Sequence, residues 1–349
     1  MRFALTGDQV DFRDAVRGLL ADTCPPAAVR TAWGGRVGEE TGGGGGDGRV
    51  RAAWSALAEM GVLGMLVPES AGGLDMDDED IVPMLVECGR AALPDPVTAT
   101  AYVAATTLRD LGGAVADEWL PRIAAGEVAV AAGPLGDAPL AGALTADAFL
   151  VGDAGVLRWI RADEVELEPV ESVDASRGLA RLRDAAAAGT VLVEGPDAAV
   201  LSGAAADRAA LGAAAELVGL SERMLEMTVA YASERRQFGV PIGSFQAVKH
   251  QLADASLAVA FAVPLVLRAA NSLAHGDPDA ALHVSMAKAK ASAAARGAAD
   301  ASLQCHGAIG YTVEYDLHLF MKRAWALAAQ AGGPDQHRVR VRAALGLRV

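Results

Sequence analysis

The sequence predicts a mainly α-helical protein with a small β domain between two helical domains. Over residues 1–127, and again over residues 204–349, apolar side chains recur three and four positions apart, which is the spacing of one face of an α-helix. Over residues 128–203, apolar and polar side chains alternate instead, as they do in half-buried β-strands. We therefore expect an N-terminal all-α domain, a reduced middle β-barrel or sheet domain and a C-terminal four-helix bundle, with these boundaries.

The composition restricts the class of protein. Of the 349 residues, 52% are hydrophobic and 21% are charged, which is enough apolar surface for a large core or subunit interface. The formal net charge of −14 and the aromatic content of 5% argue against nucleic acid or an anionic membrane as partner. No leader-like segment opens the chain and no uninterrupted apolar run reaches membrane-spanning length, so we expect a soluble cytoplasmic protein. The three cysteines are far apart, which indicates reduced thiols at Cys24, Cys88 and Cys305.

The N-terminal domain is expected to hold four helices. Thr6 begins an amphipathic helix that Pro25 and Pro26 end. Three more helices are expected, over residues 51–60, 78–90 and 99–112. The glycine run Gly42–Gly46 indicates a flexible linker, because polyglycine has maximal chain entropy. A phosphate-binding loop is the alternative, but no strand precedes the run and no Lys-Ser/Thr pair follows it.

The middle domain is expected to contain short strands. Phe149–Val151 and Val156–Ile160 flank the turn sequence Gly-Asp-Ala-Gly, which is typical of a β-hairpin. Val165 and Leu167 alternate with acidic residues like a half-buried strand, and a last strand is expected over Thr190–Glu194. Trp159 is interpreted as a structural aromatic on a strand face.

From Ala204 the helical period returns, with a stripe spaced three and four residues apart: Leu217, Leu220, Met224, Met227 and Tyr231. We interpret this stripe as core rather than as a ligand site. A long helix from Phe245 to His275 is expected to kink at Pro264. Asp277 and Pro278 are expected as N-cap and first residue of the next helix, which Gly307 ends.

The stretch Tyr231–Ala255, YASERRQFGVPIGSFQAVKHQLADA, joins two of these helices. Glycines and a proline interrupt the helix, and Ser244 is the expected N-cap of the next one. Arg235, Gln237 and Phe238 lie in the turn. They could hold a diphosphate and stack on a planar ring, because a guanidinium binds phosphate oxygens bidentately. A surface helical hairpin with solvated arginines is the more ordinary alternative.

A second phrase, QCHGAIGYTVEY over Gln304–Tyr315, follows a helix and carries two glycines that permit close approach of a ligand. A helix C-cap followed by a turn explains the same glycines. The remaining histidines have no metal-ligand context: His250, His275, His283 and His318. His337 is interpreted as structural or interfacial.

Several of these phrases, in this order, resemble the acyl-CoA dehydrogenase family, flavin enzymes that desaturate acyl thioesters. Tyr231–Ala255 resembles one family signature. Gln304–Tyr315 resembles its Q-x-x-G-G-x-G-Y segment, with Ala308 in place of the second glycine. Gly61–Met76 and Glu118–Glu127 resemble its N-terminal helical domain. The resemblance implies an acyl-CoA dehydrogenase-like fold, an FAD cofactor, an acyl-CoA substrate and an electron-transfer flavoprotein as electron acceptor.

The resemblance also implies residue roles. Arg235, Gln237 and Phe238 would contact the phosphates and ring of FAD, and Gln246 would lie near the adenine. Further contacts would come from Gln304, Cys305, His306, Gly307 and Ala308. His306 could equally be a helix cap residue. In the family these residues reach across an interface to a flavin seated mainly on another subunit, so the resemblance implies an oligomer.

The sequence departs from the family where the chemistry takes place. The flavin-facing β-domain motifs, a TEPGAGSD-like loop and a WITN-like strand, have no match in Val130–Leu144 or after it. Gly332 and Ala209 occupy the two positions at which the family carries its glutamate base. Asp207 is the nearest candidate, but two residues turn a helical side chain by about 200°. We therefore expect no catalytic base in this chain.

These observations favour a subunit that completes the FAD site of a full-length acyl-CoA dehydrogenase homologue in a heterotetramer. It is similar to the short subunits of actinobacterial heteromeric members, which often act on steroid-derived or other bulky CoA thioesters. Two alternatives remain open. One is a self-sufficient homomeric dehydrogenase with an unrecognised base, and the other is a flavin-free scaffold subunit.

Overall fold

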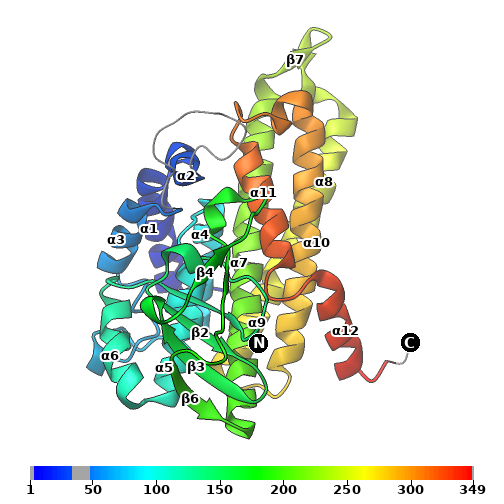
Figure 1. Cartoon of the computed structure of the whole chain (residues 1–349). Helices are drawn as coiled ribbons and strands as arrows, with labels where there is room; N and C mark the ends of the chain where they lie inside the picture. The colour runs from blue at the N-terminus through cyan, green and yellow to red at the C-terminus, as the bar shows by residue number, and fades with distance from the viewer. Residues whose placement is uncertain (1–3, 34–47, 348–349) are drawn as a thin grey trace.

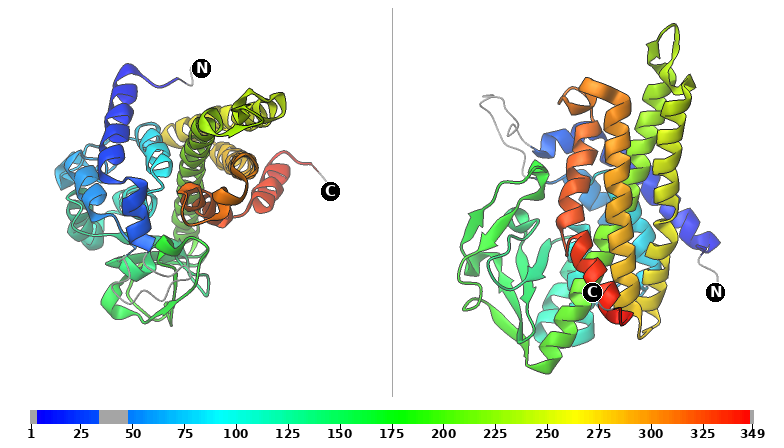
Figure 2. Two further views of the ribbon diagram at one scale, coloured as in Figure 1. Left: turned by 90° about the horizontal axis from the view of Figure 1, so that it is seen from above. Right: turned by 90° about the vertical axis from the view of Figure 1, so that its right-hand side faces the viewer.

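The computed structural model describes residues 4–33 and 48–347. It is mainly helical, with a small β region on one side of a long helical bundle and the N-terminal helices packed beside both (Figures 1 and 2). This confirms the expected fold class. The domain boundaries remain predictions, and the glycine run Gly42–Gly46 lies outside the described residues.

The N-terminal part contains six α-helices among the described residues: α1 (Gly7–Thr23), α2 (Pro26–Trp33), α3 (Arg51–Glu59), α4 (Asp78–Arg90), α5 (Ala105–Leu111) and α6 (Gly113–Ala124). Thr6 begins α1 as predicted, since its hydroxyl accepts a hydrogen bond from the Gln9 backbone N–H at 3.2 Å. Helix α2 was not expected. Pro26 ends α1 but also opens α2, because proline is tolerated in the first turn of a helix. The expected helix over residues 99–112 is a π-helical segment, Thr98–Ala104, that continues into α5.

The β region contains a sheet with strand order β1-β2-β3-β6: β1 (Val130–Pro134), β2 (Ala148–Gly152), β3 (Val156–Arg161) and β6 (Thr190–Glu194). The strands β4 (Leu167–Pro169) and β5 (Ala180–Leu182) form a separate antiparallel pair. The expected β2–β3 hairpin is confirmed, with Leu150 opposite Trp159. Trp159 is buried and meets the Trp119 ring edge-on at 4.9 Å, which confirms its structural role and joins the sheet to α6.

The C-terminal part consists of α7 (Pro196–Glu234), α8 (Gln246–Ala260), α9 (Val263–Ala274), α10 (Ala280–His306), α11 (Leu317–Ala329) and α12 (Pro334–Ala344). In Figures 1 and 2, α7, α10, α11 and the α8–α9 pair run side by side as a bundle. Helix α7 begins at Pro196 rather than at Ala204, because Gly195 precedes a proline in its first turn. Leu217, Leu220 and Met224 are buried and Met227 packs half-buried against the same core, which confirms these four as core, while Tyr231 is half-buried at the end of the helix.

Three local expectations are wrong. Pro264 lies in the first turn of α9, so α8 and α9 are two helices separated at Phe261 and Ala262 rather than one kinked helix. Asp277 accepts a hydrogen bond from the Asp279 N–H at 2.9 Å, and this local turn delays the start of α10 to Ala280. Ser244 does not cap α8, because its hydroxyl donates to the Pro241 carbonyl at 2.7 Å and Phe245 is the N-cap. By contrast, Gly307 ends α10 with a positive φ, as predicted.

The segment Gln246–Ala274 corrects the expectation about apolar runs. By length and composition alone, this part of the bundle is long and apolar enough to cross a membrane. Only 28% of its most apolar window is buried, so most of that window is not covered by the rest of the chain. Leu257 and Phe261 are 56% and 59% exposed. One face of the α8–α9 pair is therefore apolar and uncovered in the single chain.

The three cysteines are buried and free, as expected of reduced thiols. Burial raises the pKa of the Cys24 thiol to about 12. The cytoplasmic location remains a prediction.

Candidate functional site

A cavity of about 530 Å³ lies where the β sheet meets the bundle. Its walls come from β1, β2 and β3, from the first part of α7, and from the segment between α11 and α12. Most lining residues are alanine, glycine, proline or leucine. Small residues keep the space open; a Cβ on Gly152, for example, would come within 2.5 Å of the Ser202 hydroxyl. The cavity therefore exists because the sequence places small side chains on three facing elements.

The two positions that the sequence comparison with the family marked for a base meet at this cavity. Ala209 of α7 and Gly332 of the segment after α11 both line it, although they are distant in sequence. No lining residue is an aspartate or glutamate. Asp207 is not in the lining, and its carboxylate accepts a hydrogen bond from Arg340 at 2.7 Å. The structure thus brings the expected positions together and supplies no carboxylate at either.

Steric reasons keep Gly332 a glycine. Its φ is +94°, and a Cβ there would lie 2.8 Å from Nε2 of His337. His337 is buried, and its Nε2 lies 2.9 Å from the Ala331 carbonyl oxygen. This agrees with the structural interpretation of His337. Burial lowers the pKa of His337.

Lys288 of α10 holds the turn that contains Gly332, and the sequence analysis did not single out this lysine. Its side chain is fully buried and donates to the carbonyls of Ala328 at 3.0 Å and Gly332 at 3.1 Å. A third hydrogen bond goes to the Ser292 hydroxyl at 3.3 Å. Burial lowers the pKa of Lys288 to about 7. The only sequence signal was a lysine on an alanine-rich helix, and nothing in that pattern shows which of Lys288 and Lys290 faces inward.

The residues expected to contact FAD lie at the opposite end of the bundle (Figure 1). A short hairpin, β7 (Arg236–Gln237) and β8 (Val240–Pro241), projects there between α7 and α8. Phe238 at its tip has a φ of +52° and is 92% exposed. The side chains of Arg235 and Gln237 are exposed and make no hydrogen bond or ion pair within the described chain. Gln246, at the start of α8, is also exposed.

The second phrase reaches the same end of the bundle. Tyr231 at the end of α7 stacks on His306 at the end of α10, with ring centroids 4.3 Å apart. Gln304, Gly307 and Ala308 are exposed beside it. Cys305 and His306 are buried instead, and Nδ1 of His306 lies 2.8 Å from the Ser302 carbonyl oxygen. The tertiary structure therefore places the two sequence phrases side by side, and the His306 ring points into the interior of this chain and not toward solvent.

The exposed groups at this end match the chemistry of a flavin dinucleotide. Arginine donors suit phosphate oxygens, and an exposed phenylalanine offers a stacking face. Ala209 precedes Arg235 by 26 residues of one continuous helix and its end, which corresponds to about 39 Å at 1.5 Å per residue. The hairpin therefore lies too far along α7 to contact a small ligand bound in this chain's own cavity.

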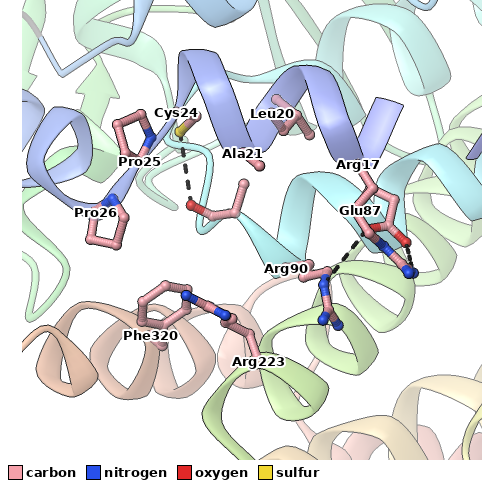
Figure 3. A pocket seen from close by; sticks show the side chains of 11 residues that line it. Arg17, Leu20, Ala21, Cys24, Pro25, Pro26, Glu87, Arg90, Arg223 and Phe320 are labelled. Atoms are coloured by element: carbon pink, nitrogen blue, oxygen red, sulfur yellow. Dashed lines mark hydrogen bonds and ion pairs between the residues drawn. The ribbon is translucent and has the colours of Figure 1, made fainter. Parts of the chain in front are cut away.

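A smaller pocket of about 180 Å³ lies between α1, α4, α7 and α11 (Figure 3). Arg17 donates two hydrogen bonds to Glu87, at 2.9 and 2.7 Å, and Arg90 pairs with Glu222 and Glu226. Arg223 also pairs with Glu226, at 3.6 Å. Since each guanidinium has a carboxylate partner, this pocket offers no unmatched charge to a ligand.

Comparisons with known proteins agree with the resemblance seen in the sequence. The family model described as acyl-CoA dehydrogenase, N-terminal domain, matches residues 6–127, and the corresponding C-terminal domain model matches residues 199–345. The chain is 33% identical over 327 residues to acyl-CoA dehydrogenase IpdE2 of Mycobacterium tuberculosis, covering 93% of each chain. It is 35% identical over 308 residues to acyl-CoA dehydrogenase FadE34 of the same organism, covering 84% of this chain and 42% of that protein.

Solved structures share the fold. The ChsE4–ChsE5 complex from Mycobacterium tuberculosis contains a chain that matches with a TM-score of 0.82 and 25% identity over 100% of both chains. A Tcur3481–Tcur3483 steroid ACAD variant matches with a TM-score of 0.84 and 22% identity, covering 97% of this chain and 98% of that one. Together with the two domain matches, these findings show that the chain belongs to the acyl-CoA dehydrogenase family of FAD-dependent oxidoreductases.

Proposed function

We propose that this chain is the non-catalytic subunit of a heteromeric acyl-CoA dehydrogenase and completes the FAD site of a catalytic partner subunit. One observation carries the proposal. The hairpin expected to contact FAD is exposed and begins about 39 Å along α7 from a cavity in which the two positions expected to carry a base, Ala209 and Gly332, have no carboxylate. A base must lie within hydrogen-bond reach of the proton that it removes.

In this arrangement Arg235 binds FAD phosphates, Phe238 packs against the ring, and Gln246 lies near the adenine. The backbone of Gln304–Ala308 supplies further polar contacts, while the Cys305 and His306 side chains support that segment from inside. The flavin, when bound, accepts the hydride in α,β-desaturation of an acyl-CoA. An electron-transfer flavoprotein is then the expected electron acceptor.

The uncovered apolar face of the α8–α9 pair supports an oligomer. Leu257 and Phe261 expose large apolar side chains to water in the single chain, and contiguous patches of this kind mark interaction sites. The partner we propose is a full-length acyl-CoA dehydrogenase homologue, and a heterotetramer in the cytoplasm is the expected assembly.

The relatives narrow the substrate class. The ChsE4–ChsE5 title describes a complex of two proteins, and the Tcur3481–Tcur3483 title describes a steroid ACAD. We therefore favour a steroid-derived or similarly bulky acyl-CoA as the substrate of the assembled enzyme.

The test is to purify this chain alone and after co-expression with a full-length homologue, and to measure visible flavin absorbance and acyl-CoA oxidation. We expect flavin and turnover only in the complex, with one FAD per pair of unlike chains. Arg235→Ala should lower the ratio of flavin to protein in that complex. Arg183→Ala, which removes an exposed arginine of the β region, is the matched control.

Other outcomes favour the alternatives. Tight FAD binding and turnover by the lone chain would show a homomeric dehydrogenase with a different base. A stable complex without flavin would indicate a scaffold subunit. Unchanged flavin content in Arg235→Ala would reject the role assigned to that residue.

A further inference from the structure

Helix α12 lies on the outside of the bundle, against α10 (Figure 1). Among the residues of α12, all of which the structure describes, only His337 is buried, and none belongs to the buried hydrophobic core. Val339 of the same helix is 60% exposed. Elements with few buried apolar contacts are the ones that open most readily. Polar contacts, rather than apolar burial, therefore hold α12 on the bundle.

Two of these contacts fix α12 and the turn that precedes it. Nε2 of His337 lies 2.9 Å from the Ala331 carbonyl oxygen, and Arg340 pairs with Asp207 of α7 at 2.7 Å. Ala331, Gly332 and Arg340 all line the large cavity. The contacts that hold α12 in place therefore also close one wall of that cavity.

The geometry around His337 suits the neutral ring. A carbonyl oxygen accepts hydrogen bonds, so the 2.9 Å contact assigns the proton to Nε2, which donates to Ala331. Nδ1 is buried and has no hydrogen-bond partner in the part of the chain that the structure describes. A second proton would sit on Nδ1 without an acceptor, and an unpaired buried charge is costly. Burial accordingly lowers the pKa of His337 below its ordinary value of 6.5.

The charged groups that act on His337 are mostly basic. Lys288 of α10, which donates to a carbonyl of the same turn at 3.1 Å, and Arg340 of α12 both oppose a positive charge on the ring. Asp207 of α7 favours that charge, but its carboxylate is already paired with Arg340. Residues 328–333, between the two helices, carry no charged side chain. No neighbour therefore compensates a protonated ring while α12 is docked.

We propose that α12 is an acid-sensitive latch on the large cavity, and that protonation of His337 releases it together with the wall formed by Ala331 and Gly332. Release brings the ring into water, where both nitrogens find partners and the second proton is stable. The released form binds more protons, so acidification lowers the free energy of release. This contribution to docking is fully present above pH 6.5, the ordinary histidine pKa, and is lost as the pH falls below it. The proposal concerns this chain's own cavity and does not rest on the FAD-completing role.

Hydrogen–deuterium exchange of the full-length chain, read by mass spectrometry between pH 7.5 and pH 4.5, tests the latch. The readout is the protection factor of each peptide, from which the intrinsic pH dependence of exchange has been divided out. We expect the protection of α12 to fall by about five- to tenfold from pH 7.5 to pH 5.5, since an ordinary histidine pKa of about 6.5 limits the effect to about tenfold. Residues 291–299, in the middle of α10, should stay protected.

His337→Gln keeps a donor for the Ala331 carbonyl without a group that titrates in this range, and it should abolish the fall. His275→Gln, the same substitution at a side chain that is 64% exposed, should leave the fall unchanged. A fall that persists in folded His337→Gln would overturn the proposal. So would an equal fall in residues 291–299, because it would indicate unfolding of the whole chain.

If His337→Gln leaves α12 unprotected even at pH 7.5, the wild-type pH profile decides. Protection that begins to fall near pH 6.5 supports titration of the histidine. Protection that stays constant down to about pH 5 and falls only below it would assign release to a carboxyl group such as Asp207, and would refute the latch.

Discussion

Replacing Lys288 with methionine tests how a buried ammonium is tolerated in this bundle. Lys288 is fully buried and is held by three hydrogen bonds, to the carbonyls of Ala328 and Gly332 and the hydroxyl of Ser292. No carboxylate forms an ion pair with it in the described residues. Burial lowers the pKa of Lys288 from 10.5 to about 7, since the charged form loses its hydration.

The sign of the effect follows from proton linkage. Between pH 7 and pH 10.5 the unfolded chain binds a proton at Lys288 that the folded chain largely does not. Stability therefore rises with pH across this window and is nearly constant below it. With one pKa unit equivalent to about 1.4 kcal/mol, this group should add about 2 kcal/mol to the free energy of unfolding between pH 7 and pH 9.

Urea unfolding followed by circular dichroism at several pH values measures this contribution of Lys288 to the free energy of unfolding. The free energy of unfolding of the wild type, relative to that of Lys288→Met, should rise by about 2 kcal/mol from pH 7 to pH 9. Titrating groups that do not interact with Lys288 cancel in the difference. Lys290→Met removes a positive charge from the same helix and is the control. Parallel pH curves for wild type and Lys288→Met, or an equal change in Lys290→Met, would refute the reasoning.

Three further predictions concern packing and reactivity. A Cβ at Gly219 would overlap the Val86 carbonyl oxygen where α4 crosses α7, so Gly219→Ala should destabilise the fold by about 1–3 kcal/mol or more. Gly203→Ala, in open space on the same helix, should instead stabilise it by about 0.5–1 kcal/mol, and urea unfolding that ranks the two equally would contradict this. Asp78→Ala should lower the free energy of unfolding by about 3–5 kcal/mol in the same assay, because the buried side chains of Tyr102 and Arg208 both lose the carboxylate to which they donate hydrogen bonds. Cys24, with its raised pKa, should resist iodoacetamide at pH 8 in the native chain and react after unfolding, as peptide mass spectrometry would show.

Local patterns were sufficient for many elements because their causes are local. Helix α4 and strand β6 have the predicted bounds, since a charged N-terminal turn and an alternating apolar run are readable over a few residues. The errors fall where two local signals compete. Pro26 could end one helix or begin another, and Asp277 could cap a helix or form its own turn.

In the candidate site, too, some features could be predicted from the sequence and others depend on tertiary contacts. The sequence by itself determined that Arg235, Gln237 and Phe238 stand together where a helix is interrupted. Its resemblance to the family implied that this turn contacts the flavin and that glycine and alanine stand at both base positions. Only the tertiary structure decided that Ala209 and Gly332 share one cavity and that no aspartate or glutamate lines it. Burial, partner distances and enclosed volume depend on contacts between elements far apart in the chain, and no local pattern encodes them.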